Sequence, residues 1–155
     1  MTVVRTIARK SRLSTMIDQA GGISVGVAKR QAQANLEGMK DRGLAIIAER
    51  IDSLNALPAP QTAEDALPAR IEAYRLSSEV IDASGMFDMQ DLCAAAKGLC
   101  DLLDAAGEDG DMDWRIVTVH AQSMRLLMSL PAEATAQRKA VTEHLNQVLV
   151  HKLGV

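Results

Sequence analysis

The three histidines of the chain are its candidates for nucleophilic or metal chemistry. His120 lies in "DWRIVTVHAQSMRLL", and His144 and His151 lie near the carboxyl end. An imidazole can accept a phosphoryl group or bind a metal ion. On a helical wheel His120 falls with Ile116 and Leu127 on the inward side, whereas the other two fall on the flank of their helix. A buried, hydrogen-bonded His120 is therefore the favoured interpretation, with a phosphorylation site at His120 as the alternative.

A cluster of acids precedes His120. Asp109, Asp111 and Asp113 have the one-three-five spacing of a calcium loop, but Trp114 stands where that loop needs glycine. His120 stands where the loop needs its bidentate glutamate. Since the histidines are also scattered, we expect no metal site. The chain has no glycine-rich phosphate loop and no Cys-x-x-Cys motif, so we expect no cofactor.

Composition favours helices packed on helices. Of the 155 residues 48% are apolar and only 2% aromatic, so Ala, Leu, Ile, Val and Met must fill the core. The net charge of −3 argues against non-specific binding to nucleic acid. Cys93 and Cys100 are seven residues apart, about 10 Å along a helix, too far for a disulfide. Reduced thiols indicate the cytoplasm, and no apolar run reaches the ~20 residues of a membrane span.

Five helical segments can be placed from periodicity and breakers. They cover roughly residues 27–57, 62–85, 89–106, 112–130 and 131 onward. "PAP" at 58–60 ends the first, Thr62 caps the second through "TAED", and Gly85 stops it. Asp88 is the expected N-cap of the third. The seam of the first helix includes Met39, Ile47 and Ile51.

Short links between these segments predict antiparallel neighbours. The expected fold is all-α, an antiparallel up-down four-helix bundle with an extra N-terminal helical segment. We divide the chain into a basic N-terminal segment, residues 1–26, and a helical bundle, residues 27–155. The basic segment carries Arg5, Arg9, Lys10 and Arg12, so it is either a solvated tail or a peptide that docks on an acidic partner.

The segment at 62–85 has two apolar faces. Ala73, Leu76 and Val80 fall on one side of the wheel, and a second set falls on roughly the other. That second set is Ile71, Tyr74, Ser78 and Ile81. A bundle helix normally presents a polar back to water. Two explanations stay open: another segment covers the second face, or the face docks a partner.

The stretch "YRLSSEVIDASGMFDMQDLCAAAKGLCDLLD" resembles the central helical hairpin of histidine phosphotransfer domains. Those domains are four-helix bundles that exchange phosphoryl groups with the receiver domains of two-component signalling. Leu76 and Ser77 match the two residues before the phosphorylated histidine, and Ser84 to Phe87 match the turn. The similarity covers about thirty residues.

Three departures alter the chemistry that the resemblance implies. Ser78 stands in the place of the histidine, Ile81 in that of a lysine and Asp82 in that of a glycine. A serine hydroxyl without a neighbouring base is a weak nucleophile, and the lost lysine removes a cation that would stabilise the transferred group. The resemblance thus implies a scaffold that keeps docking and loses catalysis.

The first hypothesis is therefore a bacterial, non-catalytic regulatory protein that binds a response-regulator receiver domain or a histidine kinase. Chemotaxis is one such signalling setting. The expected contact residues are Ile71, Tyr74, Arg75, Ser78, Ile81 and Asp82. Two alternatives stay open: an active phosphotransfer protein that uses His120, and a helical homodimer with a structural or assembly role. None of the three involves nucleic acid or a membrane span.

Overall fold

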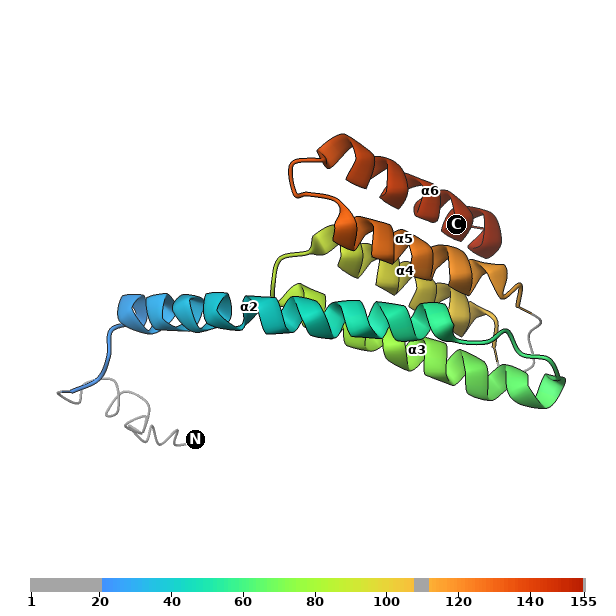
Figure 1. Ribbon diagram of the computed structural model, residues 1–155, viewed down its shortest axis with the longest axis horizontal. Coiled ribbons are helices and arrows are strands. Elements are labelled where there is room, and N and C mark those ends of the chain that lie inside the picture. The colour runs from blue at the N-terminus through green and yellow to red at the C-terminus, as the bar shows by residue number, and fades with distance from the viewer. Residues whose placement is uncertain (1–20, 108–111, 155) are drawn as a thin grey trace, which may run out of the picture. The chain divides into compact units, whose positions relative to one another are not determined.

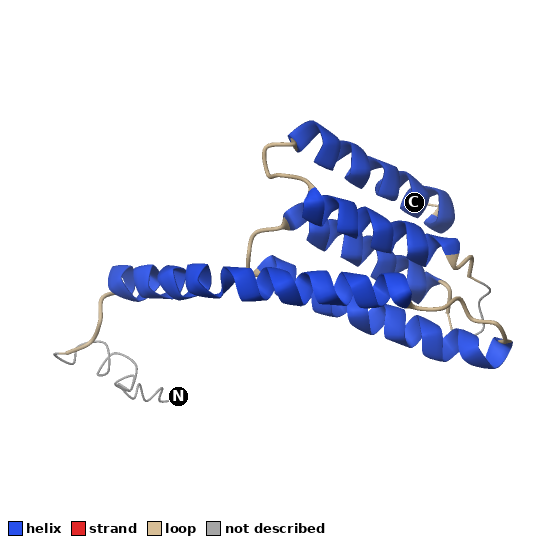
Figure 2. Cartoon of the chain, viewed as in Figure 1, coloured by secondary structure: helices blue, strands red, loops and turns tan. Residues whose placement is uncertain are grey.

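The computed structural model describes residues 21–107 and 112–154. This part of the chain forms α-helices and contains no strand (Figure 2), which confirms the all-α expectation. The helices, labelled in Figure 1, are α2 (Val25–Ala56), α3 (Ala63–Gly85), α4 (Gln90–Ala105), α5 (Arg115–Ser129) and α6 (Thr135–Leu153). The four cations expected in the basic segment lie outside the described residues.

The chain divides into two compact units, residues 1–37 and 38–155. In the first unit, the described residues include the start of α2, where the Ser24 hydroxyl accepts a hydrogen bond from the Val27 N–H at 3.3 Å. The second unit contains the rest of α2 and helices α3 to α6. It also holds the α3–α4 hairpin and His120.

Local chemistry explains where α3 begins. The hydroxyl of Thr62 accepts a hydrogen bond from the Asp65 N–H at 3.2 Å, as expected of an N-cap. That hydroxyl also donates to the Asp65 carboxylate at 2.8 Å. The predicted cap at Thr62 is therefore confirmed, although the short Asp65 side chain bonds to the hydroxyl and not to the Thr62 backbone as in a full capping box.

The expected N-cap at Asp88 is wrong. The residue that caps α4 is Met89, and Asp88 has a left-handed backbone with φ of 57°. Aspartate tolerates this conformation better than most residues because its short side chain can bond locally. Here the Asp88 carboxylate accepts a hydrogen bond from the Gln90 side chain at 3.0 Å. Asp88 thus reverses the chain between α3 and α4.

Helix α4 is central to the second unit, because it packs against α3, α5 and α6. Leu92, Ala96 and Leu99 of α4 are fully buried. Ile47 and Ile51 of α2 join the same core, whereas Met39, which the expected seam included, is largely exposed.

Ion pairs also link α2 to its neighbours. Arg50 of α2 pairs with Glu79 of α3 at 2.7 Å, and Asp52 of α2 pairs with Arg125 of α5 at 3.3 Å.

The last two helices begin later than their sequence suggests. Helix α5 begins at Arg115 and not near Met112, and α6 begins at Thr135 and not at Pro131. Residues 131–134 instead form a turn in which the Ala134 N–H bonds to the Pro131 carbonyl at 3.1 Å. Among the described helices none is both long and apolar enough to cross a membrane.

Candidate functional site

The two apolar faces of α3 have different environments. Ala73, Leu76 and Val80 are buried in the core, as the helical wheel predicts. On the other side Ile71 and Tyr74 are 60% and 39% exposed. Within residues 38–107 and 112–154 of the second unit no segment fully covers this part of the second face, and most of the N-terminal segment lies outside the described residues.

The exposed side chains open onto a groove between α3 and the end of α4. Its volume is about 270 Å³. We call it the α3–α4 groove, and its lining consists of Leu67, Arg70, Ile71, Tyr74, Leu103, Asp104 and Gly107. Leu67, which the sequence interpretation did not include, is 41% exposed. It precedes Ile71 by four residues, so helical spacing from Ile71 could have found it.

Further along α3 the second face closes. Ile81 is partly buried and packs against the core. Ser78 is half-buried, with its hydroxyl 3.9 Å from the thiol of Cys100 on α4. The six expected contact residues therefore do not form one exposed patch: Ile71 and Tyr74 line the groove, and Ser78 and Ile81 lie toward the helix interface.

Cys100 is the neighbour of Ser78 to consider as a base for its hydroxyl. The neighbouring Cys100 thiol is buried, and this burial raises its pKa. A thiol that stays protonated cannot serve as a general base for the serine. Cys100 is therefore not a base for the Ser78 hydroxyl.

Arg75, another expected contact residue, is part of an ion-pair network along α3. It donates to Glu72 at 2.6 Å and also pairs with Glu79, which in turn bonds to Arg50 of α2. The hydrogen bond to Glu72 raises the pKa of Arg75. Asp82, by contrast, is exposed near the end of the helix. Both charged residues are at the surface, although Arg75 is already bound to its own helix.

The α3–α4 hairpin is the acidic part of this protein. Residues 63–105 contain nine Asp or Glu and three Lys or Arg, a net charge of −6 in a chain whose total is −3. The carboxylate of Asp104 raises the pKa of the Tyr74 hydroxyl, with smaller contributions from Cys100 and Asp101. The groove is therefore apolar at its base and has negative charge beside it.

His120 on α5 is buried, in agreement with its inward position on the wheel. Its side chain is 0% exposed, and Nδ1 lies 2.8 Å from the Ile116 carbonyl. Burial lowers the pKa of the imidazole, so the neutral form is favoured, with Nδ1–H donating to the carbonyl. Nε2 has no hydrogen-bond partner and lies by a small cavity of about 80 Å³ between α4, α5 and α6. His144 and His151 are exposed.

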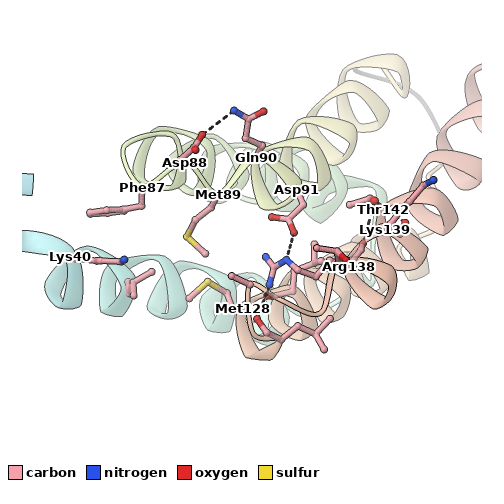
Figure 3. Close-up of a pocket in the computed structure, with 15 residues that line it drawn as sticks. Lys40, Phe87, Asp88, Met89, Gln90, Asp91, Met128, Arg138, Lys139 and Thr142 are labelled. Carbon is pink, nitrogen blue, oxygen red and sulfur yellow. Dashed lines mark hydrogen bonds and ion pairs between the residues drawn. The ribbon is translucent and has the colours of Figure 1, made fainter. Parts of the chain in front are cut away.

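A larger cavity, about 680 Å³, lies between α2, the α3–α4 turn, the end of α5 and the start of α6 (Figure 3). The side chain of Arg138 on α6 pairs here with Asp91 on α4 at 2.5 Å. Arg138 also donates to the carbonyls of Leu127 and Leu130, at 2.9 and 2.7 Å. Its cation thus bonds to carbonyls at the carboxyl end of α5, where the helix itself supplies no donor.

The charge of Asp91 is retained in this cavity. Burial alone would raise the pKa of its carboxyl, but hydrogen bonds from Arg138 and from the Leu92 N–H outweigh burial and lower it. Because Arg138 already has three acceptors, we assign the pair a structural role. No local pattern predicts this pair, since the two residues are 47 positions apart.

No group of three or more His, Cys, Asp or Glu side chains in the described ranges is placed to hold a metal ion. Two acids of the calcium-like spacing, Asp109 and Asp111, lie outside those ranges.

Comparisons with known families, curated proteins and solved structures found no match to this chain.

Proposed function

We propose that this chain is a non-catalytic docking protein similar to histidine phosphotransfer domains. It would bind the receiver domain of a response regulator, or a histidine kinase, in the bacterial cytoplasm, with chemotaxis as one setting. The observation that carries the proposal is the exposed apolar face of α3, where Leu67, Ile71 and Tyr74 border a groove. Apolar side chains gathered on one helix face are typical of protein–protein contact sites.

The arrangement of helices supports this proposal. The core of the second unit draws on α2, α3, α4, α5 and α6, and α4 packs on α3, α5 and α6. We interpret the fold as an antiparallel up-down four-helix bundle with additional helical structure. In such a bundle α3 and α4 form the central hairpin, and this hairpin carries the resemblance to phosphotransfer domains.

The loss of phosphotransfer chemistry is the second part of the proposal. Ser78 replaces the histidine, its hydroxyl lies near a thiol whose pKa is raised, and Ile81 supplies no positive charge. Docking would then compete with phosphotransfer or hold a signalling protein in place. It would not transmit a phosphoryl group.

The experiment combines this protein with phosphorylated receiver domains and an autophosphorylating histidine kinase from the source organism. Both complex formation and labelled phosphate are measured. We expect binding without label. Ile71→Glu should lose roughly tenfold or more in affinity, because it places a charge where the complex would bury an apolar side chain. Val119→Glu is the matched control, since Val119 is an exposed apolar residue on α5. Binding that survives both Ile71→Glu and Ser78→Arg would refute the proposal.

One observation favours a second candidate, phosphotransfer through His120. Its Nε2 is unpartnered and, in the neutral tautomer, carries a lone pair. Because the side chain is fully buried, this reaction would require α6 to move away. Acid-labile label that disappears in His120→Gln would establish the active alternative.

The third candidate is a homodimer that closes over the same apolar face. Sedimentation of the wild type and of Ile71→Glu over a range of concentrations tests it. A dimer that forms in the wild type and is lost in the variant would assign the face to self-association.

A further inference from the structure

The α3–α4 groove has the form of a site for another helix. Leu67, Ile71 and Tyr74 follow one another at spacings of four and three residues, so they form a strip of about two helical turns, roughly 10 Å long. Leu103 of α4 forms the opposite wall. A groove between two helices with such a strip accepts apolar side chains of a third helix at positions i, i+3 or i+4, and i+7.

Exposed acids lie around this strip. Glu64 precedes Leu67 by three residues, which places it on the same face at the beginning of α3. Asp104 lies in the lining at the α4 side. Asp101 is one turn before Asp104 and pairs with Lys97 at 2.8 Å, an exposed pair that a competing cation can share.

The cation in the lining does not reverse this balance. Arg70 is only 6% exposed, so its charge is not presented to a partner in the way that the exposed carboxylates are. It is also engaged in an interaction of its own. A docking helix would therefore contact the apolar strip of the groove, with Glu64 at one end of the strip and Asp104 at its side.

We propose that the occupant of the α3–α4 groove is an amphipathic helix of a partner protein, with lysine or arginine residues beside its apolar strip. This inference rests on the proposed docking function and specifies the chemistry of the partner. Opposite charge across the rim would speed association and select against acidic helices. An uncharged or acidic helix would fill the apolar floor but leave Glu64 and Asp104 without compensation.

The first test uses two synthetic peptides with leucine at helical spacing, one with lysine and one with glutamate at the remaining positions. Fluorescence anisotropy measures their binding to the full chain. We expect the lysine peptide to bind at least tenfold more tightly, and its affinity to fall as salt rises, because exposed charges are screened. Amide chemical-shift changes should concentrate on residues 64–74 and 101–107. Equal binding of the two peptides, or shift changes elsewhere, would overturn the proposal.

Charge variants separate the groove from the overall charge. Glu64→Gln/Asp104→Asn and the control Asp41→Asn/Glu133→Gln change the net charge equally, and all four residues are exposed. We expect the first pair to weaken lysine-peptide binding roughly three- to tenfold, as exposed charge pairs contribute little each. The control pair should have less than a twofold effect. Equal losses in both variants would mean non-specific attraction and would overturn the proposal.

The same variants distinguish this inference from the proposed function. If a receiver domain or kinase binds, but Glu64→Gln/Asp104→Asn leaves its affinity and salt dependence unchanged, the basic helix is wrong and the docking function stands. If neither signalling protein binds while the lysine peptide binds at the groove, the function is wrong and the chemistry of the occupant stands. Self-association that the groove variant abolishes would make a second copy the occupant and would overturn a separate partner.

Discussion

Replacing Arg138 with alanine should destabilise the protein strongly, because one side chain satisfies three acceptors on two helices. The pair with Asp91 is mostly buried, with side chains 16% and 22% exposed. Removing one partner of a fully buried pair costs about 3–5 kcal/mol. The residual exposure and the adjoining cavity of about 680 Å³ let water reach Asp91 and the two α5 carbonyls. We therefore expect about 2–4 kcal/mol, or a Tm lower by about 5–15 °C.

Urea unfolding followed by circular dichroism measures this change. Lys139→Ala is the matched control, because Lys139 is the next residue of α6 and its pair with Glu143 is exposed on both sides. That pair should contribute less than about 0.5 kcal/mol. The double variant Arg138→Ala/Asp91→Ala should be more stable than the sum of the single effects predicts, since it leaves no uncompensated carboxylate.

Two results would refute this reasoning. A loss in Arg138→Ala no larger than that in Lys139→Ala would mean that the pair and the carbonyl contacts do not stabilise the fold. Additive effects of Arg138→Ala and Asp91→Ala would mean that the two side chains do not interact energetically, whatever their distance.

Three further predictions concern His120, Gly43 and Thr62. Burial lowers the pKa of His120 below its usual 6.5, so the unfolded chain binds more protons and the free energy of unfolding should fall as pH decreases below about 6.5; His120→Gln should flatten this slope in urea titrations between about pH 7.5 and 5. Gly43→Ala places a Cβ against the ring of Phe87, closer than van der Waals contact allows, and should cost about 1–3 kcal/mol by thermal melts. In a Phe87→Ala background the change should instead be neutral or stabilising, and a persisting cost there would exclude the clash as its cause. Thr62→Ala should cost about 1 kcal/mol through the lost cap, and an unchanged urea midpoint would contradict this.

Periodicity predicted those features of α3 that follow from the geometry of one helix. A wheel separates Ala73 and Val80 from Ile71 and Tyr74 because side-chain direction follows from helical spacing alone. The cap at Thr62 is local in the same sense, since donor and acceptor are three residues apart. Burial of His120 also follows from the wheel, because a side chain on the inward face of α5 lies in the core.

Features that depend on contacts between two helices could not be predicted from the periodicity of one helix. The wheel places Ile81 on the same face as Tyr74. Packing between helices leaves Ile81 partly buried and Tyr74 exposed. The Arg138–Asp91 pair requires the packing of α6 on α4, which no local pattern encodes. The N-cap prediction at Asp88 is wrong because the same residue type favours both an N-cap and a left-handed turn.

The central position of α4 has a consequence for how the chain folds. Its contacts with α3 and α5 join neighbours in sequence, so the loops that close them are short and form early. Helix α6 packs on α4, although α5 separates the two in sequence. Leu145 is the one buried residue of α6. We expect its amides to exchange with solvent through local openings well before those of α4, whose exchange should require global unfolding. In this order of events, the helix that covers His120 is the last to join the domain and the first to leave it.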